Sequence, residues 1–306
     1  RALAVSHHGA RGCLVRRQPK TRILLNLTNG KDAAMASPTE ITAPQLSRLI
    51  GTPNAPLLID VRLDADFDDD PRLIPGARRH AFDQIMALVP KLNGQSVVIY
   101  CQKGLKISQG AAALLRAEGV KAETLKGGQF AWRDAGLPMV DARKLPPRNA
   151  HGQTVWVTRH RPKVDRIACP WLIRRFVDPK AQFLFVEPGQ VMNVADRFDA
   201  TPFDMEDVFW SHRGDTCTFD TMLDEFGIRT EALDRLASIV RGADTNRHDL
   251  APEAAGLLAA SLGLSRMYRD DLEQLEAGLA LYDAFYRWAR DATGETHDWP
   301  MPGGAA

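Results

Sequence analysis

Hydrophobic positions along the first half of the chain alternate between short apolar runs and amphipathic stretches, from about Thr39 onward. The apolar runs predict strands, and the stretches with helical spacing predict helices. The expected strands are 57–61, 97–100 and 120–125, and the expected helices are 81–89 and 108–118. Thr42-Ala43-Pro44-Gln45 predicts a further helix start, because proline favours the first turn. Strands that alternate with helices predict an α/β fold, a parallel sheet with helices on both faces.

The second half has a different pattern. Short apolar runs at 155–158 and 183–186 predict two strands around a helical stretch at 165–176. Beyond residue 217 the spacing is largely helical, with expected helices at 219–226, 230–241, 252–262 and 270–290. The apolar stripe of the last helix is typical of a core-facing surface. We therefore expect a mainly α (α+β) C-terminal domain.

Composition shifts divide the chain into five segments. The prolines and polar residues of 144–153 predict a linker. The expected segments are a disordered basic N-terminal extension (1–35), an α/β domain (36–143), the linker (144–153), a mainly α domain (154–293) and a tail (294–306). The basic, acid-poor extension is either a transit-type leader or an unstructured stretch upstream of a start at Met35.

Composition excludes several classes of protein. The chain has 306 residues, 44% of them hydrophobic and 25% charged, with a formal net charge of +1. No apolar run approaches the ~20 residues that span a bilayer, so no membrane contact is expected. The near-neutral charge gives no argument for a nucleic-acid partner. The cysteines show no close pairing in sequence, which favours a reducing, cytoplasmic location; they are Cys13, Cys101, Cys169 and Cys217.

Cys101 stands at the point where a predicted strand enters a short loop. The loop holds Lys103, Gly104 and Lys106, and a helical stretch follows at once from Ser108. A loop of this kind turns backbone N–H groups inward, and the helix end adds partial positive charge. Both stabilise a thiolate and hold a small anion beside it. The alternative is a buried structural cysteine at a strand end.

These residues resemble the rhodanese-like sulfurtransferase family, whose active loop runs over six residues from a cysteine. The supporting segments are Asp60-Val61-Arg62, Ile74-Pro75-Gly76-Ala77, Cys101-Gln102-Lys103-Gly104-Leu105-Lys106 and Gly127-Gly128-Gln129-Phe130-Ala131-Trp132. The chain departs from the family at Asp66, Leu73 and Gln102, where glutamate, histidine and arginine are common. Phosphatase-like relatives carry a loop one residue longer that ends in arginine, so the loop length here favours sulfur transfer.

The resemblance implies a role for each residue of the loop. Cys101 would be the nucleophile and would carry sulfur as a persulfide. Asp60 would give structural support. The substrate would be bound by Gln102, Lys103, Gly104, Leu105, Lys106 and Arg62. The implied partners are thiosulfate or a similar sulfur donor and a thiol or cyanide acceptor, and sulfur transfer requires no cofactor.

The second half resembles the C-terminal domain of the chromate-resistance (ChrB-type) family. The supporting segments are 165–176, 212–220 and 239–245. The resemblance implies a role in chromate resistance or sensing, with chromate as a further partner. Regulators of that family carry a DNA-binding N-terminal half that this chain lacks. An alternative function is therefore a non-catalytic module that senses chromate or redox state, or that delivers sulfur.

Polar residues of the second half also suggest a divalent metal. Imidazole, thiolate and carboxylate groups suit zinc or iron, and Glu187 and His212 are the expected ligands, near Cys217 and Asp244. Alternatively, Asp165 simply caps its helix and Cys169 is simply buried. A basic cluster is either a solvated face or an oxyanion receptor; it comprises Arg159, Arg161, Lys163, Arg166, Arg174 and Arg175.

Overall fold

The computed structural model of the protein describes residues 37–295, except Asn93. The described residues belong to one compact unit. The predicted basic extension, with Cys13, and nearly all of the predicted tail lie outside the described residues. The predicted α/β and mainly α regions are both present, in the expected order.

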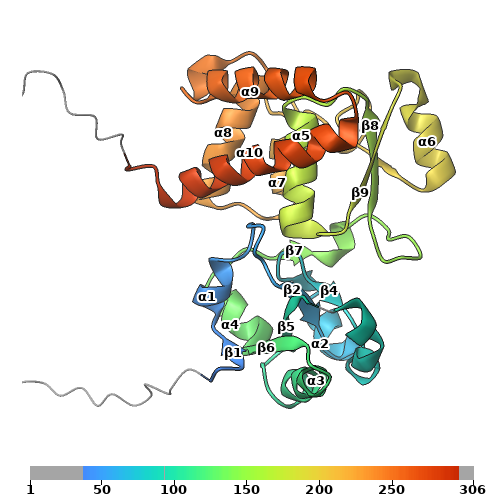
Figure 1. Ribbon diagram of the computed structural model, residues 1–306, viewed down its shortest axis with the longest axis vertical. Coiled ribbons are helices and arrows are strands. Elements are labelled where there is room, and N and C mark those ends of the chain that lie inside the picture. Colours follow the sequence, from blue (N-terminus) through green and yellow to red (C-terminus); the bar gives the residue numbers. More distant parts are fainter. Residues whose placement is uncertain (1–36, 93, 296–306) are drawn as a thin grey trace, which may run out of the picture. The chain divides into compact units, whose positions relative to one another are not determined.

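A five-stranded parallel sheet forms the centre of the first region (Figure 1). Its strand order is β1 (Glu40–Ile41), β6 (Lys121–Leu125), β5 (Ser96–Tyr100), β2 (Leu57–Asp60) and β4 (Arg78–Arg79). The central strands β5 and β2 are the buried apolar runs that predicted them, because a parallel sheet covered on both faces excludes water from every side chain. The carboxyl ends of these strands consequently lie at one edge of the sheet.

Helices cover both faces of this sheet. One face packs against η1 (Phe82–Lys91) and α3 (Lys106–Ala117). The other packs with α1 (Ala43–Ser47) and α4 (Gly128–Asp134). Alternate strand residues serve the two faces, since successive side chains of a strand point in opposite directions. The predicted helix start is confirmed, because Thr42 and Gln45 form a capping box.

Some local elements differ from the prediction. The helix expected at 81–89 is a 3₁₀ helix that runs to Lys91 with Pro90 inside it, and proline lacks the N–H that α-helical bonding requires. A short helix, α2 (Asp64–Asp69), and an antiparallel pair, β3 (Arg72–Leu73) with β7 (Val140–Asp141), were not anticipated. The predicted linker begins beside η2 (Ala142–Lys144) and is anchored by an ion pair between Arg148 and Asp178 at 2.9 Å.

The second region contains a three-stranded parallel sheet. Its order is β10 (Thr201–Pro202), β8 (Val155–Arg159) and β9 (Gln182–Val186). One face packs against α6 (Val191–Phe198), which follows the 3₁₀ turn η4 (Pro188–Gln190). The opposite face is turned toward α5 (Asp165–Leu172), as Figure 1 shows.

The remaining helices complete a large apolar core. They are the π-helical turn η3 (Ile173–Val177), α7 (Thr218–Phe226), α8 (Glu231–Asp244), the 3₁₀ turn η5 (His248–Leu250), α9 (Ala254–Met267) and α10 (Asp271–Asp291). Fully buried Trp171 lies among the rings of Phe219, Tyr282 and Tyr286. The stripe of the last helix therefore faces the core, as predicted.

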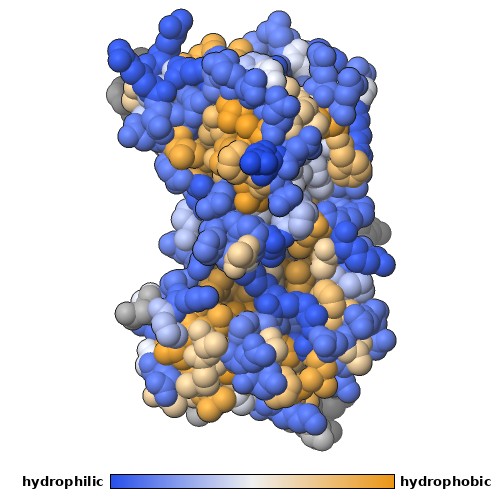
Figure 2. Space-filling view, turned by 90° about the vertical axis from the view of Figure 1, so that its right-hand side faces the viewer, coloured by the Kyte–Doolittle hydropathy of each residue, from blue (hydrophilic) through white to orange (hydrophobic). Residues whose placement is uncertain are grey.

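Apolar side chains outside the core are distributed over the surface. On the face shown in Figure 2, hydrophobic residues form separate orange patches among hydrophilic ones. Among the helices of residues 37–295, none combines the length and the apolar character that a membrane crossing requires.

Candidate functional site

Cys101 lies directly after the carboxyl end of β5, where the chain turns toward α3. Its side chain is mostly enclosed, at 6% exposure. The Sγ atom lies 3.3 Å from the Oγ of Ser108, whose hydroxyl also donates to the carbonyl of Leu105 at 3.1 Å. A thiol in this position faces the first turn of a 12-residue helix, where the helix dipole favours negative charge.

The loop between Cys101 and α3 presents backbone donors that no protein group uses. The N–H groups of Gln102, Lys103, Gly104 and Leu105 have no hydrogen-bond acceptor among residues 37–295. Backbone N–H groups are obligatory donors, so a row of free ones beside a thiol suits a small anion. The side chains of Lys103 and Lys106 are exposed and surround this loop with positive charge.

Two glycines allow the loop to approach the start of α4. Gly104 has φ of +67° and Gly128 has φ of +60°, both in the left-handed region. A Cβ on Gly104 would lie 2.5 Å from the Gly128 nitrogen, and a Cβ on Gly128 would overlap the Cys101 carbonyl oxygen. The shape of the loop therefore depends on both glycines.

Asp60 and Arg62 form a buried pair that braces the site. Their side chains are fully enclosed, and an Arg62 nitrogen lies 2.6 Å from Asp60 Oδ2. Arg62 also donates to the Asp70 carbonyl at 2.7 Å, and Gln129 donates from its side chain to Asp70 Oδ2 at 2.9 Å. Asp60, expected to give structural support, has its carboxylate enclosed in this pair. Arg62, expected to bind substrate, has its guanidinium enclosed in the same network.

Gln129 and Ser108 belong to this site, although the sequence did not single them out for a role. The Gln129 backbone N–H donates to the Cys101 carbonyl at 3.0 Å, which fixes the chain just before the loop. Gln129 Oε1 is buried without a hydrogen-bond partner among the described atoms. In the sequence, only their positions could have indicated a role. Gln129 follows the paired glycines, and Ser108 stands seven residues after Cys101.

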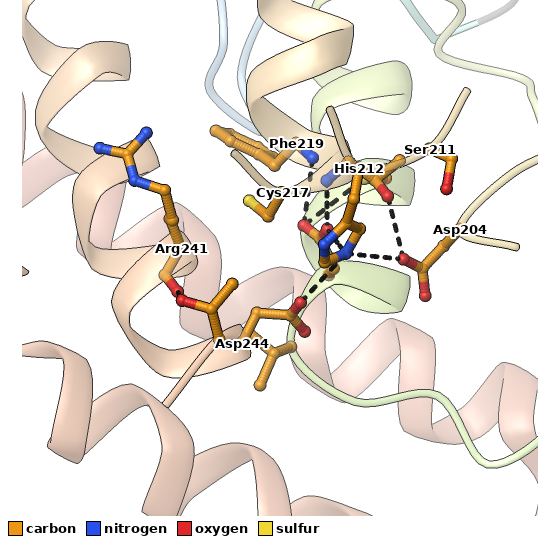
Figure 3. A network of polar contacts seen from close by, with 12 residues as sticks. Asp204, Ser211, His212, Cys217, Phe219, Arg241 and Asp244 are labelled. Carbon is orange, nitrogen blue, oxygen red and sulfur yellow. Dashed lines mark hydrogen bonds and ion pairs between the residues drawn. The ribbon is translucent and has the colours of Figure 1, made fainter. Parts of the chain in front are cut away.

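A second polar cluster surrounds His212 in the mainly α region (Figure 3). The Nε2 atom lies 3.3 Å from Asp244 Oδ2, 3.4 Å from Asp204 Oδ1 and 3.5 Å from Asp165 Oδ2. One ligand atom from each of Asp165, His212 and Asp244 lies within 4.8 Å of the others. Three carboxylates thus face one ring nitrogen, which can donate to only one of them at a time.

Four separate segments supply this cluster. Asp165 is the first residue of α5, Asp244 is the last of α8, and Asp204 follows β10 in a left-handed conformation. Asp165 does not cap its own helix, because its carboxylate accepts from the backbone N–H groups at the start of α7, those of Thr218 and Phe219. The cluster is therefore attached to the ends of three helices.

The charges of the cluster act on one another. The three carboxylates raise the pKa of His212 above its ordinary value. Burial raises the pKa of Asp165, and the negative charges of Asp244 and Asp204 add to this effect, whereas His212 opposes it. Burial also raises the pKa of the Cys169 and Cys217 thiols, and Asp165 adds to both shifts. The whole neighbourhood thus disfavours further negative charge.

The two residues expected to bind metal contact different groups. His212 belongs to the cluster, whereas Glu187 is largely exposed and pairs with His160 Nε2 at 3.1 Å. The Cys169 thiol contacts Asp165 at 3.8 Å, and the Cys217 thiol contacts Asp220 at 3.4 Å. Sequence reasoning noted Asp165 and Asp244 but missed Asp204, which no local pattern distinguishes.

The basic cluster of the sequence does not converge on one point. The arginines contact several different protein groups: Arg159 and Arg166 share Asp204, Arg161 bonds to carbonyls of Ser265 and Tyr268, Arg174 pairs with Glu276, and Arg175 pairs with Asp283. The arginines are therefore ion-paired, and with 17–19% exposure the side chains of Arg166, Arg174 and Arg175 do not form a solvated face.

Comparison with known proteins finds a family match in each half. Residues 42–135 match the family described as Rhodanese-like domain, and residues 156–289 match the family described as ChrB, C-terminal domain. A curated "Sulfurtransferase" of Allochromatium vinosum is 33% identical over 104 residues, which are 33% of this chain and 94% of that protein. "Protein ChrB" of Cupriavidus metallidurans is 32% identical over 192 residues, 58% of this chain and 57% of that protein.

Two solved structures are similar to part of this chain. A rhodanese-like domain protein from Staphylococcus aureus is 26% identical and covers 31% of this chain and 90% of its own, with a TM-score of 0.28. The protein SSP1007 from Staphylococcus saprophyticus is 28% identical and covers 32% and 95%, with the same TM-score. Through residues 42–135 the chain belongs to the rhodanese-like family, and its residues 156–289 are similar to the ChrB C-terminal domain.

Proposed function

We propose that the protein is a sulfurtransferase that takes sulfur from thiosulfate. The observation that carries the proposal is the loop after β5, where backbone N–H groups without an acceptor in the described part of the chain follow the Cys101 thiol. Such donors stabilise an anionic sulfur without a cofactor. Membership of the rhodanese-like family supports the same reaction class, and so does the 33% identity over 104 residues with the curated relative named "Sulfurtransferase".

In the first half-reaction the Cys101 thiolate attacks the outer sulfur of thiosulfate. The sulfur–sulfur bond of thiosulfate breaks, and sulfite leaves with the bonding electron pair. Cys101 keeps the transferred sulfur as an anionic persulfide, which the loop N–H groups and the start of α3 stabilise. Lys103 and Lys106 attract the dianionic donor to the loop.

In the second half-reaction an acceptor collects the sulfur. A thiolate or cyanide attacks the terminal sulfur of the persulfide, and the electron pair of the broken bond returns to Cys101. The product is a new persulfide or thiocyanate. The chain thus cycles between two covalent states. Asp60, Arg62 and Gln129 position the loop and take no part in bond making.

The ChrB C-terminal domain connects this chemistry with chromate resistance. Chromate oxidises thiols, so a persulfide-forming enzyme joined to this domain would act where thiols need restoring. The described cysteines are all free, which supports work in a reducing, cytoplasmic setting. The competing function is a sensor in which Cys101 is modified once and not turned over.

Replacement of the nucleophile tests the proposal. Cys101→Ser is expected to reduce thiosulfate:cyanide sulfur transfer about a thousandfold or more, because the covalent step is lost. Cys13→Ser serves as the matched control and keeps full activity. Intact-mass measurement after thiosulfate treatment should show the gain of one sulfur atom in the wild type and none in Cys101→Ser. Unreduced transfer by Cys101→Ser contradicts the assignment, and thiol modification without multiple turnovers favours the sensor.

A further inference from the structure

The cluster around His212 gathers ligand atoms at the spacing of a metal coordination shell. Its Nε2 lies 3.5 Å from Asp165 Oδ2 and 3.3 Å from Asp244 Oδ2. These separations are long for a charge-assisted N–H···O bond, which is usually about 2.7–2.9 Å. Ligands about 2.1 Å from a tetrahedral ion lie about 3.4 Å from one another. The distances therefore fit a shared ion better than a set of direct hydrogen bonds.

The end of α8 supplies an independent electrostatic reason for a cation. Asp244 is the last residue of this 14-residue helix, where the helix dipole is already negative. Its only ion-pair partner among residues 37–295 is His212, and that imidazole is shared with two other carboxylates. A carboxylate is normally unfavourable at this end of a helix, and a bound cation would compensate for it.

The surrounding contacts hold the ligands in place, as metal sites require. Asp165 accepts backbone N–H groups of Thr218 and Phe219 at 2.6 and 3.2 Å. The loop before α7 is fixed by Ser211, which donates to the Met205 carbonyl at 2.6 Å. Asp204 does not belong to the three-ligand group and is already bonded to Thr218 at 2.9 Å.

We propose that Asp165, His212 and Asp244 bind one divalent first-row transition-metal ion. One imidazole and two carboxylates suit manganese, iron or zinc, since imidazole distinguishes these ions from the all-oxygen preference of magnesium and calcium. The Asp165 side chain is 1% exposed, whereas His212 is 40% and Asp244 22% exposed. The ion would thus be anchored on its inner side. Its outward coordination positions would be left to water or to a small anion, as in sites with three protein ligands.

Metal binding by the full chain tests this site directly. After removal of metal with a chelator, equilibrium dialysis with Mn²⁺ or with Zn²⁺ should detect one bound ion per chain, and electron paramagnetic resonance verifies the Mn²⁺ form. His212→Gln and Asp244→Asn should each weaken binding at least about tenfold, because each removes a ligand. Both positions are partly exposed, and far-UV circular dichroism verifies that each variant is folded.

His160→Gln is the matched control. His160 also pairs with a carboxylate, that of Glu187, but outside the cluster; its variant should bind Mn²⁺ as the wild type does. Absence of stoichiometric Mn²⁺ and Zn²⁺ binding in the wild type, or equal binding in His212→Gln and Asp244→Asn, would show the cluster to be an ion-paired network only. Thiosulfate:cyanide transfer should stay unchanged in both ligand variants, so this result is separate from the fate of Cys101.

Discussion

The Cys101 loop is formed mainly by backbone groups, whereas the His212 cluster is formed by side chains. Backbone N–H groups and two glycines shape the loop, and all of its donors come from one short segment. The His212 cluster consists of side chains from four segments. Its members Asp165 and Asp244 are the farthest apart in the sequence. A site made of backbone depends on local conformation, whereas a site made of side chains depends on the packing of the helices that carry them.

The two sites also differ in the charges that they carry. The loop combines an enclosed thiol with exposed lysines, so its negative charge arrives with the substrate. The His212 cluster already holds three carboxylates. Asp178 shows the opposite solution in the same region, since it is fully enclosed but faces Arg78 and Arg148 and accepts the Thr154 backbone N–H at 2.7 Å. Burial alone would raise the pKa of Asp178, but these partners lower it.

The largest expected effect concerns this balanced aspartate. Asp178→Asn should lower the free energy of unfolding by about 3–5 kcal/mol, because it leaves two arginines around a neutral group. A lowered folded-state pKa means that the carboxylate stabilises the protein above its unfolded pKa of about 3.9 and loses this contribution as the pH falls further. Urea unfolding of the wild type and of Asp178→Asn should therefore show a difference in the free energy of unfolding that is largest at pH 6 and decreases below pH 4. A constant difference would contradict the ionic origin.

The next effect tests whether backbone shape controls the loop. Gly128→Ala places a Cβ against the Cys101 carbonyl and requires a left-handed conformation, so it should reduce sulfur transfer about 100-fold through displacement of the thiol. Gly110→Ala is the matched control, because a Cβ there meets no atom within 4 Å. Activity assays with thiosulfate and cyanide compare the two. Equal activity in both variants would mean that the close approach does not shape the site.

The smallest effect concerns the lysines of the loop. Lys103→Ala and Lys106→Ala should each raise the KM for thiosulfate a few-fold, with little change in kcat, because exposed charges act mainly by attracting the anion. The increase should shrink at high ionic strength, where exposed charges are screened. Lys121→Ala, at the start of β6 and also exposed, is the control. A loss of kcat instead would assign these lysines a direct role in the reaction.

The sequence predicted the parallel sheet and the loop because both depend on continuous segments. Buried runs such as 97–100 are visible as unbroken apolar stretches, and Cys101 follows one of them directly. Strands of two residues, such as β1 and β3, carry no such pattern. The 3₁₀ form of η1 also escaped prediction, since helical spacing does not distinguish it from an α-helix.

The His212 cluster was only partly predictable for a related reason. Asp204 is brought to the cluster by the pairing of β10 with β8, and no spacing in the sequence encodes that pairing. Glu187 looked equivalent to Asp244, because each follows a predicted element. The structure distinguishes them through tertiary packing, since Glu187 pairs with His160 and Asp244 faces His212.

The enclosure of Cys101 has a consequence for the acceptor. With only 6% of the residue accessible, the sulfur admits slender reagents far more readily than bulky ones. Cyanide and low-molecular-weight thiols are slender reagents of this kind. In the proposed reaction, a macromolecular acceptor would have to present its thiol on a protruding segment, so the enclosure of Cys101 would favour small acceptors.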